Sequence, residues 1–291
     1  MWFWLALIAL LCWSGSDLFS KIGCQGEDDH LAHLKMVIAV GTVMGLHAAY
    51  EIFVGGTEIS FSIILTYLPV SLLYIGSMTL GYMGLRYIEL SVSSPICNSS
   101  GALVALMTLI FLGGEDYSPL AIGAIILVCV GAIGLGVVDA TEDPELRAAR
   151  QEQGNRKYTK SFLALALPVA YCLLDAAGTF ADNRVLETLN EASANCAYEL
   201  TFLAAAVLSF IYVVIIRRDR LVPRMEAPKF LGAICETAGQ FAYIYAIADT
   251  EHLAMSAPII SAYCAASVLW SRLFLKEKLS WKHYLMIALV V

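Results

Sequence analysis

The segments LALIALLCWSGSD at residues 5–17 and LALALPVAYCLLD at residues 163–175 share one apolar pattern that ends in an aspartate. Trp13 corresponds to Tyr171, and Asp17 to Asp175. An ionisable residue within an apolar helix is costly unless it faces a cavity, a partner or a transported ion. Two such copies predict a duplicated membrane protein with a polar site between its halves, a pattern typical of carriers.

The composition places the whole chain in a membrane. Hydrophobic residues make up 59% and charged residues 15% of the 291 residues, with a mean hydropathy of +0.72. Soluble domains carry about 25% charged residues, and a spanning helix needs about 20 mostly apolar ones. We therefore expect an all-α integral membrane protein with spans near 2–23, 31–53, 62–88, 92–112, 119–138, 161–182, 194–216, 229–248, 253–274 and 280–291. The last span is short by roughly eight residues, so we expect the natural chain to continue.

A second pair of matching segments extends the repeat. SSPI at residues 93–96 is echoed by SAPI at 256–259. The expected domains are a five-helix repeat at 1–138, a cytoplasmic linker at 139–160 and a second five-helix repeat at 161–291. An odd number of helices per repeat inverts the second half relative to the first. Pro95 and Pro258 are then equivalent, and we expect them to form paired bends near the cavity, with simple kinks at helix starts as the alternative.

Basic residues predict the orientation. Counted loop by loop, 17 of the 18 Lys and Arg residues fall on the side of the odd-numbered loops, and only Arg184 falls on the other side. By the positive-inside rule, the odd loops are cytoplasmic and both termini face outward. We expect a multi-pass protein of the cell (inner) membrane.

The remaining residue patterns exclude several alternatives. The eight cysteines include no close pair, so we expect neither a disulfide framework nor a metal site. The sequence carries no Gly-x-Ser-x-Gly, His-Glu-x-x-His or P-loop motif. We expect no cofactor, no enzyme activity and no nucleic-acid partner. Small residues at Gly41, Gly45, Gly131 and Gly134 predict close helix packing.

The helix endings IFLGGE at 110–115 and LFLKEKLS at 273–280, with the five-plus-five pattern, resemble the drug/metabolite transporter superfamily and its EamA-type carriers. The resemblance covers nearly the whole chain. It implies a cavity lined mainly by the first, third, fourth, sixth, eighth and ninth helices. It also implies substrates such as amino acids, drugs, sugars, cofactor precursors or quaternary amines.

Polar and aromatic side chains at helical spacing supply the candidate site. Carboxylates combined with aromatic faces are what recognition of an ammonium group requires. The expected substrate-binding residues are Trp13, Asp17, Tyr74, Tyr82, Asn98, Tyr171, Asp175, Glu236, Gln240, Tyr243 and Tyr263. The expected coupling or gating residues are Asp175, Glu236, Glu199, Lys21, Arg86, Glu89, Pro95 and Pro258.

Several of these residues also have purely structural explanations. Lys21 lies one turn from Asp17 and can pair with it, whereas Asp175 and Glu236 have no basic neighbour within a turn. Glu199 lies near its helix start, where it can reach outside water. His47 more often packs than relays protons.

The leading hypothesis is a secondary transporter that moves a small cationic or zwitterionic metabolite, such as a choline-like quaternary amine, by alternating access. Asp175 and Glu236, with Asp17 assisting, would couple transport to protons or membrane potential. A multidrug or amino-acid exporter of the same fold is the alternative, and a membrane enzyme acting on lipid-linked substrates is a remote one. The expected partners are a small molecule and the bilayer, with the protein a monomer or weak homodimer.

Overall fold

The computed structural model is all-helical and describes residues 2–26, 29–111, 118–143, 145–146, 162–247 and 259–291. Within these residues, helical segments that continue one another group into ten helices. They are α1 (Trp2–Cys24), α2 (Ala32–Tyr50) with the wider turn η1 (Glu51–Gly55), α3 (Phe61–Gly84), α4 (Leu90–Asn98) with α5 (Ser100–Phe111), α6 (Pro119–Thr141), α8 (Phe162–Val185), α9 (Glu191–Phe210) with η2 (Ile211–Ile216), α10 (Pro223–Ile247), α12 (Tyr263–Trp270) with η3 (Ser271–Leu275), and α13 (Trp281–Val290).

The helices have the length and surface of a membrane protein. Seven of those described are long and apolar enough to cross a bilayer. Large apolar side chains point outward, with Phe53 85% and Leu120 84% exposed. Such a surface is unfavourable in water and suits hydrocarbon. The predicted all-α membrane fold with ten helices is confirmed.

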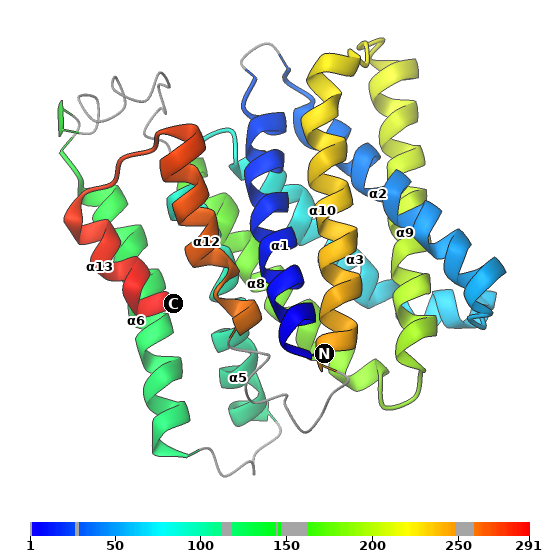
Figure 1. Ribbon diagram of the computed structural model, residues 1–291, viewed down its shortest axis with the longest axis horizontal. Helices are drawn as coiled ribbons and strands as arrows, with labels where there is room; N and C mark the ends of the chain where they lie inside the picture. Colours follow the sequence, from blue (N-terminus) through cyan, green and yellow to red (C-terminus); the bar gives the residue numbers. More distant parts are fainter. Residues whose placement is uncertain (1, 27–28, 112–117, 144, 147–161, 248–258) are drawn as a thin grey trace.

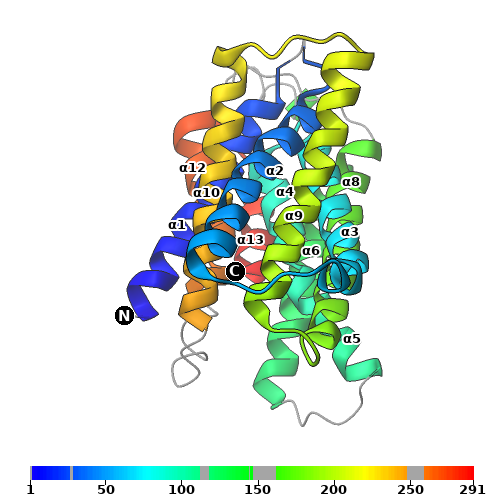
Figure 2. The same cartoon turned by 90° about the vertical axis from the view of Figure 1, so that its right-hand side faces the viewer.

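The helices pack in pairs that join the two predicted halves (Figures 1 and 2). Helix α1 lies against α10, α2 against α9, α3 against α8, α6 against α13, and α12 against α4. In the predicted repeat, each helix of one half has an equivalent in the other half. If equivalent helices are exchanged, the α1–α10 pair becomes the α8–α3 pair, and each of the other three pairs becomes itself. The inverted repeat and the domain boundaries at 138 and 160 stay predictions, and most of the linker lies outside the described residues.

Glycines allow two of these pairs to approach closely. A Cβ atom at Gly41 would collide with the Phe202 carbonyl and the Ala206 side chain, and one at Gly131 would meet the Met286 carbonyl of α13. Helix backbones can approach this far only where the interface residue is small. The predicted close packing at both positions is confirmed.

The fourth predicted span is broken into two helices. Helices α4 and α5 meet at Ser99, whose hydroxyl donates to the Ile96 carbonyl at 2.6 Å. Pro95 lies buried inside α4, just before the break. A proline removes one helix donor and disturbs the preceding turn, and the residues that follow it face the cavity described next. Pro258, its predicted equivalent, lies outside the described residues.

Candidate functional site

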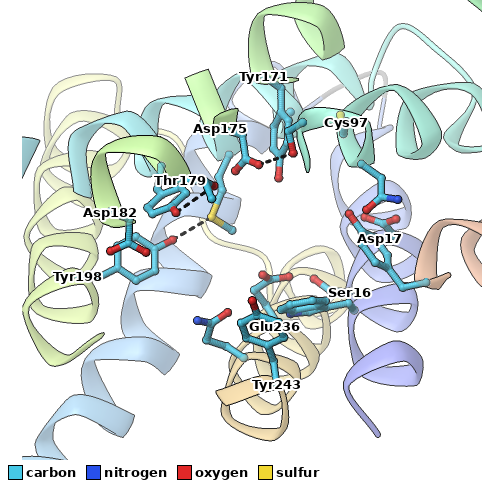
Figure 3. Close-up of a pocket in the computed structure, with 18 of the residues that line it drawn as sticks. Ser16, Asp17, Cys97, Tyr171, Asp175, Thr179, Asp182, Tyr198, Glu236 and Tyr243 are labelled. Atoms are coloured by element: carbon cyan, nitrogen blue, oxygen red, sulfur yellow. Dashed lines mark hydrogen bonds between the residues drawn. The ribbon is translucent and has the colours of Figure 1, made fainter. Parts of the chain in front are cut away.

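A cavity of about 580 Å³ lies between the helices, within the range typical of small-molecule sites. In Figure 3, Asp175 and Tyr171 of α8, Glu236 and Tyr243 of α10, and Asp17 of α1 point toward one open space. Residues far apart in the sequence thus converge on a single site.

All eleven residues predicted to bind substrate line this cavity. They are Trp13, Asp17, Tyr74, Tyr82, Asn98, Tyr171, Asp175, Glu236, Gln240, Tyr243 and Tyr263. Their proximity follows from the structure, but their role in binding stays a prediction. The lining also includes side chains from α9, the seventh helix, which the expected set of lining helices omitted. Asn195 and Tyr198 are two of these.

Five carboxylates line the cavity, and no Lys, Arg or His is present among its described lining residues. The carboxylates are Asp17, Asp175, Asp182, Glu191 and Glu236. Hydroxyl groups rather than cations satisfy the deep ones. Ser100 donates to Asp175 at 2.7 Å, and Glu236 lies beside Ser16.

The Asp17 carboxylate is also held by serines. Ser94 of α4 donates to it at 2.5 Å, and Ser267 of α12 donates to it at 2.7 Å. Lys21 instead donates to the carbonyls of Leu85 and Ile88, at the C-terminal end of α3. A cation is favoured where the last carbonyls of a helix gather. Lys21 thus caps α3, and its pairing with Asp17 stays one of the predicted alternatives.

Aromatic rings line the same cavity as the carboxylates. The ring centroids of Trp13 and Tyr243 are 5.1 Å apart, and those of Trp13 and Tyr263 are 5.7 Å apart. On the α3 side, the Tyr74 hydroxyl donates to Thr179 at 3.1 Å and the Tyr67 hydroxyl donates to Asp182 at 2.6 Å. The cavity combines negative charge with the electron-rich faces of rings.

The cavity reaches the surface on the side of the even-numbered loops. Asn183 near the end of α8 and Glu191 at the start of α9 belong to its lining and are exposed. At the opposite end, Ser20, Leu85 and Leu90 line it and are buried. The structure therefore has a cavity open toward the even loops and closed toward the odd loops.

A buried group of ion pairs lies on the closed side, between the loop after α1 and the starts of α2 and α10. We call this the odd-side cluster and define it as Asp29, Lys35, Glu226 and Lys229. Lys35 lies 2.9 Å and Lys229 3.0 Å from Asp29, and Lys229 lies 3.1 Å from Glu226. Burial opposes ionisation of Asp29, but hydrogen bonds and charges from both lysines outweigh it and hold the pKa of its carboxyl below its usual range.

Glu277 adds a second contact between distant segments on this side. Its carboxylate accepts from the backbone N–H of Leu90 and Ser91 at 3.1 and 3.0 Å, at the start of α4. A carboxylate there satisfies helix donors that otherwise have no partner. Glu277, which follows the ninth predicted span in the sequence, thus caps α4, the first helix of the fourth predicted span.

The other predicted gating residues that the structure describes, Lys21, Arg86, Glu89, Pro95 and Glu199, are not among the lining residues of the cavity. Arg86 donates to the Asp29 carbonyl at 3.0 Å, and Glu89 is buried just before α4. Glu199 is 1% exposed, and it lies 2.9 Å from His47 Nδ1 and accepts from Asn195 at 3.3 Å. The expectation that Glu199 reaches outside water is wrong, because α2 covers it.

The helices and the cavity together define a multi-pass membrane protein with a polar site inside the bundle. A model of the UAA transporter family matches residues 37–291, most of the chain, so the protein belongs to the UAA transporter family. This family is part of the drug/metabolite transporter superfamily, and that predicted resemblance is confirmed. The narrower EamA-type assignment has no support from the match.

One solved structure, titled "Crystal structure of protein", is similar over 99% of this chain and 94% of that chain, with a TM-score of 0.53 and 15% identity. At this identity the likeness shows the fold alone. Among curated proteins, no match is found. Family membership confirms the expectation of a transporter rather than an enzyme.

Proposed function

We propose that the protein is a secondary transporter that carries a small cationic or zwitterionic metabolite by alternating access. The observation that supports this most is the charge of the cavity: five carboxylates and no basic side chain among its described lining residues. A cationic substrate would offset this negative charge, and an anionic one would add to it.

The aromatic lining favours an ammonium or quaternary ammonium group. The Trp13 ring lies within contact distance of both the Tyr243 ring and the Tyr263 ring. A cation over such ring faces gains about 0.5–2 kcal/mol, more when water is excluded. Hydroxyl and amide groups of Thr179, Asn195 and Gln240 would bind the polar part of the same molecule.

Asp175 and Glu236 are the proposed coupling residues. A carboxylate that binds either the substrate cation or a proton links the two, because both compete for one site. Asp17, held by Ser94 and Ser267, would assist from α1 and connect the site to α4 and α12.

The odd-side cluster would serve as the closed gate of this cycle. It holds the loop after α1 against the starts of α2 and α10, and these segments would separate for the cavity to open toward the odd loops. If the basic loops are cytoplasmic, the structure is an outward-facing state, with both termini outside the cell's inner membrane.

Exchange of nucleotide sugars is the second candidate, because the matched family is one of nucleotide-sugar transporters. A cavity of about 580 Å³ does not exclude such a molecule on volume. The diphosphate, however, would meet the carboxylates of the lining without a basic partner among the described lining residues. Two like charges placed against each other in a desolvated site cost several kcal/mol. Export of drugs or amino acids is the remaining alternative.

The test is uptake by the purified full-length protein in liposomes. A panel of labelled quaternary and primary amines, amino acids and nucleotide sugars is offered with and without a pH gradient or a membrane potential. We expect uptake of at least one ammonium compound, at a rate that depends on the gradient. Uptake or exchange of nucleotide sugars alone would overturn the proposal.

A further inference from the structure

A second group of ionisable side chains lies away from the cavity, where α6 meets α13. Asp139 in the last turn of α6, Glu142 directly after that helix and His283 in the first turn of α13 form it. All three are buried, with 2%, 8% and 0% exposure. Their ligand-type atoms all lie within 4.8 Å of one another.

We infer that these three residues form a binding site for a divalent transition-metal ion, with Zn²⁺ as the best-fitting ion. The Nε2 atom of His283 lies 3.7 Å from Asp139 Oδ1. This separation is too long for a hydrogen bond, and it is close to the ~3.4 Å that separates two ligands of a tetrahedral ion with bonds of about 2.1 Å. Small side-chain rotations would bring the three atoms into coordination.

The histidine is oriented as metal-binding histidines are. Its Nδ1 atom forms a hydrogen bond of 2.7 Å with Ser280 Oγ. If Nδ1 donates this hydrogen bond, Nε2 is left as the ligand atom. That Nε2 atom is fully buried and has no hydrogen-bond partner among the described residues. A polar partner on the second ring nitrogen commonly fixes the tautomer and raises the affinity for the metal.

The ligand set selects the class of ion. An imidazole ligand suits zinc and related transition metals, and zinc also accepts carboxylate ligands, whereas magnesium and calcium prefer oxygen ligands alone. The position at the C-terminal end of α6 also favours a cation. Three protein ligands leave a fourth position for water.

A metal here would join the two helices that are peripheral in the bundle. Helices α6 and α13 pack on each other, and the site lies at one end of their contact. An ion bridging them would hold the short α13 in place. This inference departs from the expectation of no metal site, which rested on the cysteines. It concerns none of the cavity residues and does not depend on the transported substrate.

The test is metal binding by the purified full-length protein after chelator treatment. Zn²⁺ is titrated by calorimetry, and the metal retained after dialysis is counted by mass spectrometry. We expect one ion per chain and a higher unfolding temperature with Zn²⁺. His283→Gln and Asp139→Asn should each weaken binding more than tenfold, and Ser280→Ala about tenfold, the lower end of the loss typical for such partners.

Two further variants separate the outcomes. Glu236→Gln removes a carboxylate from the cavity and should leave Zn²⁺ affinity unchanged. His283→Cys should give bound Co²⁺ a thiolate charge-transfer band, provided that gel filtration shows a folded protein. Zn²⁺ binding that survives in both His283→Gln and Asp139→Asn would overturn the proposal. Binding that is lost in Glu236→Gln alone would also overturn it, and so would the absence of stoichiometric Zn²⁺ binding to the folded wild type.

Discussion

The central cavity and the odd-side cluster both place carboxylates inside the protein, but they stabilise them differently. In the cluster, Asp29 and Glu226 lie next to lysines at 2.9–3.1 Å. In the cavity, Asp17 and Asp175 accept hydrogen bonds from serines, and no basic side chain is among the described lining residues. The difference suggests that the cluster's charges are matched within the protein, whereas those of the cavity are left to attract a cation from outside.

The largest effect is expected from breaking the cluster. Lys229→Met removes one of the two lysines that neutralise the buried carboxylates of the cluster. Removing one partner of a buried ion pair typically costs about 3–5 kcal/mol of folding free energy. Cys24, 1% exposed, lies at the end of α1 that packs on Lys229. With the other seven cysteines replaced, we expect maleimide labelling of Cys24 to accelerate by at least a hundredfold. Arg224→Met, which removes an exposed cation from the same helix, is the control. Equal labelling in both variants would show that the cluster does not close this side.

The next effect concerns the cavity carboxylates. Glu236→Gln and Asp175→Asn keep the shape of the side chains and remove their charge. Losing the partner of a buried cation costs about 3 kcal/mol, so we expect about a hundredfold weaker binding of an ammonium substrate, measured by calorimetry and liposome uptake. Glu58→Gln, in an exposed loop, is the matched control. Unchanged uptake in both cavity variants would show that these carboxylates are not the site.

A smaller effect is expected from the rings. Trp13→Leu keeps an apolar side chain but removes the ring that contacts Tyr243 and Tyr263. A cation–π contact of about 1–2 kcal/mol corresponds to roughly five- to thirtyfold in affinity. We expect the loss for a quaternary ammonium compound and little change for an uncharged ligand of the same shape. An equal loss for both ligands would indicate packing alone.

The smallest effect is the pH dependence of the cluster. Because the pKa of Asp29 is lowered in the folded protein, its contribution to stability is fully present above the usual carboxyl range and is lost as pH falls through the folded pKa. Wild type should therefore exceed Asp29→Asn in unfolding temperature by a constant amount from pH 7 to about 5. The difference should shrink at lower pH. A difference that grows on acidification would contradict this assignment.

The sequence predicted the fold and the cavity lining because both depend on simple patterns. Hydropathy predicted the membrane spans. Polar residues at helical spacing, on the helix faces that carry Asp17, Asp175 and Glu236, identified the faces that line the cavity. Partners from distant segments were not predictable. Lys21 caps α3, Ser94 and Ser267 hold Asp17, and His47 covers Glu199, because helix packing decides which polar groups meet. The proximity of His283 to Asp139 likewise arises only when α13 packs on α6.

The most direct test compares an ammonium ligand with its uncharged isostere, in which a carbon replaces the nitrogen. Both are titrated by calorimetry into the purified protein, using the best-binding quaternary ammonium compound of the uptake panel. We predict that wild type prefers the cation by about a hundredfold, and that the Asp175→Asn/Glu236→Gln double variant loses this preference. Equal affinity for the two ligands in the wild type, or a preference that survives in the double variant, would contradict a cation-binding cavity.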